Sequence, residues 1–312
     1  ATTEIYTLSL HDALPILPSL GVVIDLVGDV KLRGTWSRTI GRPTFKELSP
    51  VSQQDRLGGQ TFAGHPTLGV SHLENYDMRL EWNPGDGRLA SVSGFFKEID
   101  DPIDYSLRPT QFGVPYILPF NYPKGEVLGL EVELRQGLGR LWRPLESFLI
   151  GGSYTWLEAT VSVDPGEAER MRERIVQAKK TALGIPPHEP APPALINSID
   201  TSERRMKDQP EFIASLFLLY DLPRTGTSAG LFLNHTGEVL IAGDDFSGEE
   251  YIPNRVKKPF TSLDCSISQR IGAHGKLTLA VSNLLDPVVE EVWQSEFVDQ
   301  GEATASAYRK GR

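Results

Sequence analysis

The sequence is short of several kinds of residue, and each shortage excludes a class of protein or site. Only one of its 312 residues is a cysteine, Cys265, which excludes an internal disulfide and a cysteine-built metal site. No run of about 18 consecutive apolar residues occurs, so no membrane-spanning helix is expected. Positive charge is scarce too, since 31 Lys and Arg face 41 Asp and Glu. The net charge of -10 argues against a nucleic-acid partner, because binding phosphates requires an excess of basic residues.

Recognisable catalytic and metal-binding motifs are also missing. None of the six histidines forms an H-E-x-x-H pair, and there is no G-x-S-x-G turn and no phosphate-binding loop. We therefore predict no catalytic residue, no metal site and no cofactor. Two acidic clusters carry oxygen ligands of the kind that Ca²⁺ prefers, but we expect both to be solvated loops. They are Asp100, Asp101 and Asp104, and Asp244, Asp245, Glu249 and Glu250.

The first residues have a different character from the rest. Residues 4–16 read EIYTLSLHDALPI, which resembles the conceptual translation of a common short-read sequencing adapter. We interpret residues 1–16 as an assembly artefact and leave them out of the fold and the function. On this interpretation residues 17–312 are a fragment, and the natural protein begins further upstream.

From Leu17 onward, segments with period-two alternation are separated by turns, which predicts an all-β protein. In residues 76–82, for example, Tyr76 and Leu80 fall on one face of a strand, whereas Asp77 and Glu81 fall on the other. About ten such strands can be identified, with an eleventh near Tyr308. They cover residues 20–27, 30–38, 76–82, 88–99, 127–135, 148–160, 212–222, 229–233, 260–271 and 276–285.

The connections between these strands alternate in length. Short turns are expected at residues 27–29, 83–87, 137–145, 223–226 and 272–275, and long loops at 39–71, 101–125, 163–207, 237–258 and 286–305. Within the third long loop, residues 166–183 are rich in Glu, Arg, Lys and Ala and should form a solvated helix. This alternation is typical of a transmembrane β-barrel with tight turns at one end and large loops at the other. A soluble sandwich also has one apolar and one polar face, so strand periodicity alone does not separate the two.

Several short motifs, in order along residues 17–312, resemble segments of TonB-dependent outer-membrane receptors. Residues 35–50, TWSRTIGRPTFKELSP, resemble the family's S-x-T-x-x-R-P strand exit, where Pro43 has no N–H to donate to a ladder. Residues 64–68, GHPTL, resemble its G-N-P-x-L loop, although His65 replaces the usual Asn. Residues 129–133, GLEVE, and 281–286, VSNLLD, resemble two later strands of the family.

The resemblance implies a fold, a location and a function. The fold would be a partial antiparallel transmembrane barrel, about half of the family's barrel of about 22 strands. The family takes up scarce solutes of the siderophore, cobalamin or oligosaccharide type across the outer membrane of Gram-negative bacteria. Its partners would be outer-membrane lipid, the transported solute, and TonB, which acts through an N-terminal plug. Two alternatives stay open, namely another outer-membrane barrel such as an adhesin or porin, and a soluble β-rich binding domain.

Solute contacts in such barrels would come from the external loops and from residues near the outer rim of the lumen. Aromatic residues in long loops are the candidates, because an exposed apolar ring is unfavourable in water and often marks a binding site. The predicted ligand-binding residues are Tyr105, Phe112, Tyr116, Phe120, Tyr122, His235, Tyr251 and Trp293.

Overall fold

The computed structural model describes residues 17–54, 61–108, 115–243, 252–295, 302–309 and 311. The adapter-like residues 1–16 therefore lie outside the described residues. An 11-stranded antiparallel sheet dominates the fold, with β11 (Glu203–Arg205) attached to one side of β10. Its path is β1 (Ser19–Asp25), β2 (Val30–Gly41), β5 (Ser71–Gly85), β6 (Arg88–Asp100), β9 (Lys124–Gly137), β10 (Phe148–Ser162), β12 (Phe212–Leu222), β13 (Thr227–Thr236), β16 (Phe260–Ile271) and β17 (Gly275–Val281). Each of the ten predicted strands is confirmed by one of these.

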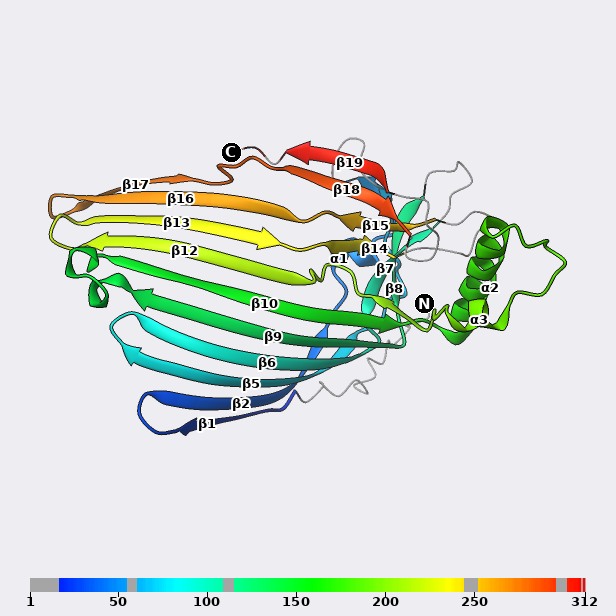
Figure 1. Cartoon of the computed structure of the whole chain (residues 1–312), viewed down its shortest axis with the longest axis horizontal. Coiled ribbons are helices and arrows are strands. Elements are labelled where there is room, and N and C mark those ends of the chain that lie inside the picture. Colours follow the sequence, from blue (N-terminus) through cyan, green and yellow to red (C-terminus); the bar gives the residue numbers. More distant parts are fainter. Residues whose placement is uncertain are drawn as a thin grey trace, which may run out of the picture.

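The short connections also lie where the sequence predicts them, and they gather at one end of the sheet (Figure 1). The turn between β5 and β6 is the tightest, because Asp86 and Gly87 both have positive φ, 54° and 72°. Two consecutive left-handed residues match the twist of a hairpin, which is why Asp-Gly is common there. The longer connection from β9 to β10 carries two 3-10 turns, Leu138–Arg140 and Arg143–Leu145.

At the opposite end, the last wall strands continue into a second sheet of four strands. Its order is β14 (Val239–Ala242), β15 (Asn254–Lys257), β18 (Val288–Gln294) and β19 (Ala303–Arg309). β14 directly follows β13, and β15 directly precedes β16, so the same strands run on past the edge of the main sheet. β19 contains Tyr308, which confirms the predicted eleventh strand.

The loops predicted at 39–71 and 101–125 are not irregular throughout, which corrects the sequence-based expectation. They contain α1 (Phe45–Leu48) and a small sheet ordered β3 (Gln53–Gln54), β4 (Thr61–Phe62), β8 (Tyr116–Asn121) and β7 (Ile103–Arg108). Sequence periodicity did not reveal these strands, because they are short and pair with segments far away in the chain. For instance, β4 pairs in parallel with β8. We call β7 and β8 together the mouth hairpin.

The predicted helix is confirmed as α2 (Pro165–Ala182), followed by α3 (Pro193–Asn197). Asp164 caps α2 by accepting a hydrogen bond from the backbone N–H of Gly166. Met171 and Ile175 bury the inner face of the helix against Val163 and Ile199. Among the described residues, no helix combines the length and the apolar character needed to cross a bilayer.

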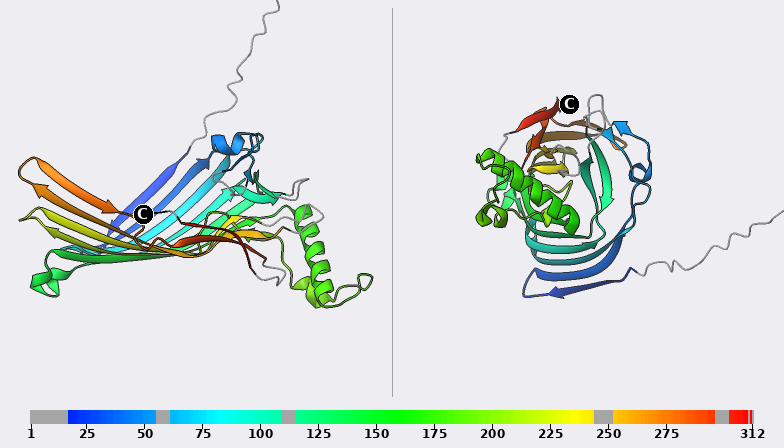
Figure 2. Two further views of the ribbon diagram at one scale, coloured as in Figure 1. Left: turned by 90° about the horizontal axis from the view of Figure 1, so that it is seen from above. Right: turned by 90° about the vertical axis from the view of Figure 1, so that its right-hand side faces the viewer.

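Two perpendicular views show that the main sheet is strongly curved, so that its strands form a rounded wall (Figure 2). The helices and the small sheets lie at the end with the long connections (Figures 1 and 2). β1 and β17 are the last strands of the main path, and in the part of the chain described they do not pair with each other. The structure is therefore an open portion of a barrel wall.

Candidate functional site

The two faces of the wall differ in chemistry. Directly paired residues of neighbouring strands share a face, so the register assigns every side chain to one of the two. One row runs through Leu80, Val92 and Val132 to Tyr154, and three of these side chains are among the exposed large hydrophobics. We call this the outward face. The residues on either side of Leu80, Arg79 and Glu81, point to the other face and are largely covered.

Aromatic side chains form two bands on the outward face. Tyr76 and Trp82 mark the two bands on β5, and Tyr154 and Phe148 mark them on β10, six residues apart in both strands. At roughly 3.3 Å per residue, the bands lie about 20 Å apart along each strand. Such rings suit the two interfaces of a membrane, with apolar side chains between them.

The tilt of the strands follows from the register of these bands. The strand register pairs Trp82 with Ala90, Ala90 with Leu134 and Leu134 with Gly152, so Trp82 of β5 lies opposite Gly152 of β10. The aromatic residue of the same band on β10 is Phe148, which lies four residues closer to the short-turn end. Four residues correspond to a displacement of roughly 13 Å along the strand direction. The three strand-to-strand steps from β5 to β10 correspond to a distance of roughly 14 Å across the sheet. The band therefore crosses the strands at about 45°, the tilt expected of a transmembrane barrel.

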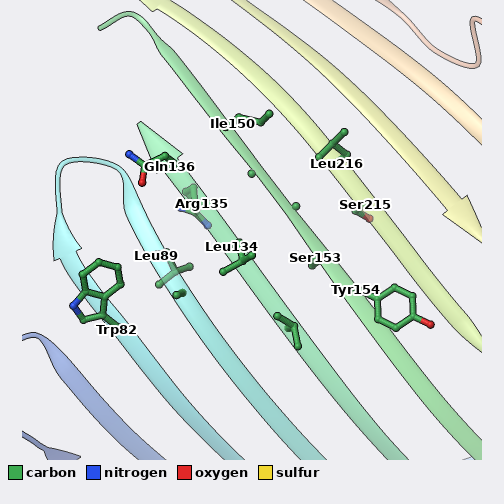
Figure 3. A pocket seen from close by; sticks show the side chains of 14 residues that line it. Trp82, Leu89, Leu134, Arg135, Gln136, Ile150, Ser153, Tyr154, Ser215 and Leu216 are labelled. Carbon is green, nitrogen blue, oxygen red and sulfur yellow. The ribbon is translucent and has the colours of Figure 1, made fainter. Parts of the chain in front are cut away.

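Small residues leave a shallow hollow of about 550 Å³ between the bands. Ala90 and Gly152 are among its lining residues, and the side chains of Trp82, Tyr154 and Leu216 stand apart around it (Figure 3). Its lining is mainly apolar, as the hydrocarbon side of a wall requires.

The inward face carries a chain of alternating charges across β2, β5 and β9. Arg33 lies 3.7 Å from Glu81, which accepts a hydrogen bond of 3.1 Å from Arg79. Arg79 also donates to Glu133 at 2.9 Å, and Arg135 donates to the other oxygen of Glu133 at 2.8 Å. Side chains of this kind, paired across strands, form the polar lining expected of a wide lumen.

The mouth hairpin is joined to β14 at the long-connection end. The backbone N–H of Leu107 donates to the carbonyl of Gly243 at 3.1 Å, and the N–H of Gly243 donates to the carbonyl of Tyr105 at 3.0 Å. Leu107, Ile117, Phe62 and Ala242 form a buried cluster beneath this junction. A segment between β6 and β9 is thereby attached to the continuation of β13, a strand that lies three places beyond β9 in the main sheet.

Asp104 lies completely buried at the centre of this junction. One carboxylate oxygen is 3.2 Å from the guanidinium of Arg204, and the other accepts hydrogen bonds from the N–H groups of Tyr105 and Lys207. Burial raises the pKa of Asp104, although the positive charge of Arg204 acts in the opposite direction. The expectation that Asp104 lies in a solvated loop is therefore wrong.

A second carboxylate, Glu47 of α1, holds Tyr105 in place. The hydroxyl of Tyr105 donates to Glu47 at 2.8 Å, and the backbone N–H of Thr44 donates to the other oxygen at 2.7 Å. Burial alone would raise the pKa of Glu47, but these hydrogen bonds outweigh it and the pKa lies below its ordinary value. Burial and the bond to Glu47 raise the pKa of the Tyr105 hydroxyl, so the phenol remains protonated.

Four predicted ligand-binding residues lie in packed, cation-covered positions at the mouth. Tyr105 lies under the ammonium of Lys207, and Tyr122, which is buried, lies under Arg204. Phe120 is covered by Arg108, and Trp293 of β18 by Arg255. Each ring therefore has a packing role in this structure.

The remaining predicted residues differ in position. Tyr116 begins the half-buried strand β8 at the mouth. The expectation that His235 lies in an external loop is wrong, because it is part of β13. It is paired there with Ala214, which faces outward. It hydrogen-bonds Thr261 there. Phe112 and Tyr251 lie outside the described residues.

Sequence reasoning missed Glu47, Arg204 and Lys207 as residues of the mouth. Arg204 and Asp104 are too far apart in the chain for any spacing motif to link them. The one usable signal was the Thr44-to-Glu47 capping box after Pro43, which predicts α1 but not its contact with Tyr105. In the described portion, no group of three His, Cys, Asp or Glu side chains is placed to hold a metal ion.

Comparisons with known proteins agree with this geometry. Residues 10–284 match the family described as "TonB dependent receptor-like, beta-barrel", and this match begins inside the adapter-like stretch. A search of curated proteins found no match.

Solved structures show the same fold. A variant of the ferric enterobactin receptor PfeA from Pseudomonas aeruginosa, in complex with enterobactin, is 16% identical, with a TM-score of 0.55 over 94% of this chain and 39% of that one. The copper transporter OprC is 16% identical, with a TM-score of 0.54 over 93% and 37%. The siderophore receptor PirA from Pseudomonas aeruginosa is 15% identical, with a TM-score of 0.50 over 87% and 39%.

This chain thus spans less than two fifths of the length of those receptors. The family match, which covers most of the sequence, agrees with the two-faced, tilted wall that the register reveals. The chain belongs to the TonB-dependent receptor family of outer-membrane transport proteins, and its fold is the β-barrel of that family.

Proposed function

We propose that this chain is part of an active transporter in the outer membrane of a Gram-negative bacterium, which takes up a scarce solute with energy delivered through TonB. The observation that carries the proposal is the two-faced wall. Its outward face is apolar between two aromatic bands, whereas its inward face carries the charge chain from Arg33 to Arg135. Such a wall separates hydrocarbon from a polar passage.

The mouth supports an uptake receptor better than an open pore. The mouth hairpin does not project freely, because hydrogen bonds join it to Gly243 after β14 and the buried Asp104–Arg204 pair joins it to β11. A segment fixed in this way at the mouth would offer its residues to a solute arriving from outside.

We propose that solute contacts come from the aromatic residues of the mouth. Tyr105, Tyr116, Phe120, Tyr122 and Trp293 remain proposed contacts, together with Phe112 and Tyr251. His235 is left out, because its strand position faces outward. Rings next to guanidinium and ammonium groups suit a large solute with both aromatic and anionic parts. We favour a siderophore-type solute over a cobalamin or an oligosaccharide, because two of the similar structures are named as siderophore or ferric enterobactin receptors.

The first experiment is to recover the whole gene from the source DNA and read upstream of the Leu17 codon. We expect an open frame that encodes further strands, a plug domain and a signal peptide, with no codons for EIYTLSLHDALPI. A start codon directly before a genomic copy of that peptide would contradict the artefact interpretation and leave a self-contained β protein. A complete barrel without a plug would favour a porin or an adhesin.

The second experiment measures uptake by the complete protein. A strain lacking the gene should take up an iron-loaded siderophore more slowly during iron limitation, and the complete gene should restore the rate. Uptake that is unchanged by loss of TonB would contradict the proposed energy coupling. Normal siderophore uptake with impaired copper uptake would assign the protein a different solute.

A further inference from the structure

Arg88 lies at the short-turn end of the wall, next to the shallow hollow of the outward face. It stands two positions before Ala90, and Gln136 stands two positions after Leu134, the partner of Ala90 in β9. Because alternate residues of a strand share a face, Arg88 and Gln136 are opposite each other on the outward face. The guanidinium of Arg88 covers the indole ring of Trp82, with 5.6 Å from Cζ to the ring centroid. The side chain therefore lies at the level of the aromatic band that Trp82 marks.

Among the residues described, the guanidinium of Arg88 has one ionic neighbour. The carboxylate of Asp86 lies 3.8 Å away, a distance too long for a hydrogen bond. Nε of Arg88 is buried and has no hydrogen-bond partner within the described ranges of the chain. A guanidinium has five N–H donors, and leaving them unpaired next to hydrocarbon is costly. The position therefore favours an external anion, and phosphate is the anion that a membrane supplies at the level of its headgroups.

Asp86 places a negative charge on the aqueous side of Arg88. It lies in the turn between β5 and β6, with its side chain 77% exposed, whereas the side chain of Arg88 is 16% exposed. From the hydrocarbon toward water, the wall thus presents an apolar surface, a cation and an anion. A phospholipid that carries an amine presents an acyl chain, a phosphate and an ammonium in the same direction. The two orders of charge are complementary.

The hollow begins beside Arg88 and extends into the hydrocarbon region. Gln136 lies at one end of it and Tyr154 at the other (Figure 3). Tyr154 is paired with Val132, which is four residues from Gln136, so the hollow is roughly 13 Å long. Its lining is mainly apolar. An acyl chain of a lipid therefore suits the hollow in both shape and chemistry.

The position of this site in the membrane determines which lipids reach it. In outer-membrane barrels the short turns face the periplasm. The periplasmic leaflet of the outer membrane is made of phospholipids. Among these, phosphatidylethanolamine carries both the phosphate that complements Arg88 and the ammonium that complements Asp86.

We propose that Arg88, Asp86 and the hollow bind one phospholipid of the periplasmic leaflet that carries an amine. Its phosphate contacts the guanidinium of Arg88, its ammonium lies toward Asp86, and one acyl chain occupies the hollow between Leu134 and Ile150. This inference concerns the lipid-facing side of the wall and is independent of the transported solute and of TonB. An anionic phospholipid without an amine would still contact Arg88, but it would bring no cation to Asp86.

The proposal can be tested by native mass spectrometry of the complete receptor, released from nanodiscs that contain equal amounts of phosphatidylethanolamine and phosphatidylglycerol. We expect the unmodified protein to retain phosphatidylethanolamine in preference. Arg88→Gln should lower the retention of both lipids about twofold to fivefold, the range set by an exposed ion pair, because both carry a phosphate.

Two further variants separate the parts of the site. Asp86→Asn should abolish the preference, so that both lipids are retained about equally; Asn tolerates the positive φ of this position, 54°, and keeps the turn. Ala90→Leu changes no charge but fills part of the hollow, and it should lower the retention of both lipids.

Arg224→Gln is the matched control, because Arg224 is an exposed arginine in the turn between β12 and β13, at the same end of the wall but outside the hollow. Circular dichroism of each variant verifies that the protein is folded. Unchanged retention in Arg88→Gln, an equal loss in Arg224→Gln, or a preference that survives in Asp86→Asn would overturn the proposal. A dimer in place of a lipid adduct would also overturn it and would assign the hollow to a second copy of the protein.

Discussion

The guanidinium of Arg204 lies 3.2 Å from the carboxylate of Asp104, and this buried pair links β11 to the mouth hairpin. Arg205 points to the other face and pairs with Glu238 in a more exposed position. Two consecutive arginines thus serve opposite sides of the wall. A substitution of Arg204 therefore tests the contact with Asp104, and a substitution of Arg205 tests the contact with Glu238 on the other face.

Arg204→Met should destabilise the mouth strongly, because it leaves the Asp104 carboxylate buried without its cation. Breaking a buried pair in this way costs about 3–5 kcal/mol. The measurement is limited proteolysis of the mouth hairpin in detergent, combined with urea unfolding. Arg205→Met is the control and should cost less, since Arg205 retains more solvent contact. Equal effects of the two substitutions would contradict the assigned burial.

The bond between Tyr105 and Glu47 predicts a pH dependence of mouth stability. Because the folded-state pKa of Glu47 lies below its ordinary value of 4.5, its contribution is present above that value and is lost as the pH falls through the folded-state pKa. Proteolysis of the mouth should therefore accelerate below about pH 4.5. Glu47→Gln should be less stable at pH 7 and should show a smaller acid-dependent change. An unchanged acid response in the variant would exclude Glu47 as the cause.

The inward charge chain predicts unequal effects of two arginines. Arg79 bonds Glu81, Glu133 and Ser93, so Arg79→Met removes one hydrogen bond from each of two carboxylates and should cost about 1–3 kcal/mol, although Glu133 keeps its bond to Arg135. Arg135 is more exposed and bonds Glu133 alone, so Arg135→Met should cost less. Urea unfolding in lipid vesicles measures both. A larger loss for Arg135→Met would contradict the order of contacts.

The two faces of the wall predict opposite responses at neighbouring positions. Leu130 is an exposed outward residue between the aromatic bands, so Leu130→Arg should destabilise the lipid-embedded wall by about 2–4 kcal/mol. Glu131→Arg changes the next residue, on the inward face, and should cost much less. Unfolding from vesicles distinguishes them. Similar costs would mean that the outward face is not in contact with lipid.

Glycine substitutions test the packing of the inward face. A Cβ on Gly129 would lie 2.1 Å from the ring of Phe95, so Gly129→Ala must displace that ring and should cost about 1–3 kcal/mol. Gly34 lies on the outward face opposite Met78 and has open space around it, so Gly34→Ala should have little effect and serves as the control. Thermal unfolding in detergent compares the two. A stable Gly129→Ala variant would show that the Phe95 ring moves freely.

The sequence by itself determined the wall. Period-two alternation located all ten main strands and assigned their faces, because a strand side chain has only two directions in which to point. The alternation of short and long connections determined which end carries the turns, and the helix predicted over residues 166–183 followed from its composition. The family resemblance rested on local motifs such as residues 35–50, and the family match agrees with it.

Only the tertiary structure decided what the long loops do. Leu107 pairs with Gly243, and Asp104 with Arg204, across more than a third and nearly a third of the chain respectively, and no local pattern encodes such contacts. From the sequence, Asp104 was expected to be solvated. In the structure it is buried, because folding brings the guanidinium of Arg204 next to it and balances its negative charge. Residues 207–210 leave the ladder with β10 for the same reason, since the N–H of Lys207 donates to Asp104 and the N–H of Asp208 donates to the carbonyl of Leu240. The face on which a strand residue lies depends on its neighbours in the chain, whereas pairing between loops depends on which segments the curvature of the wall brings together.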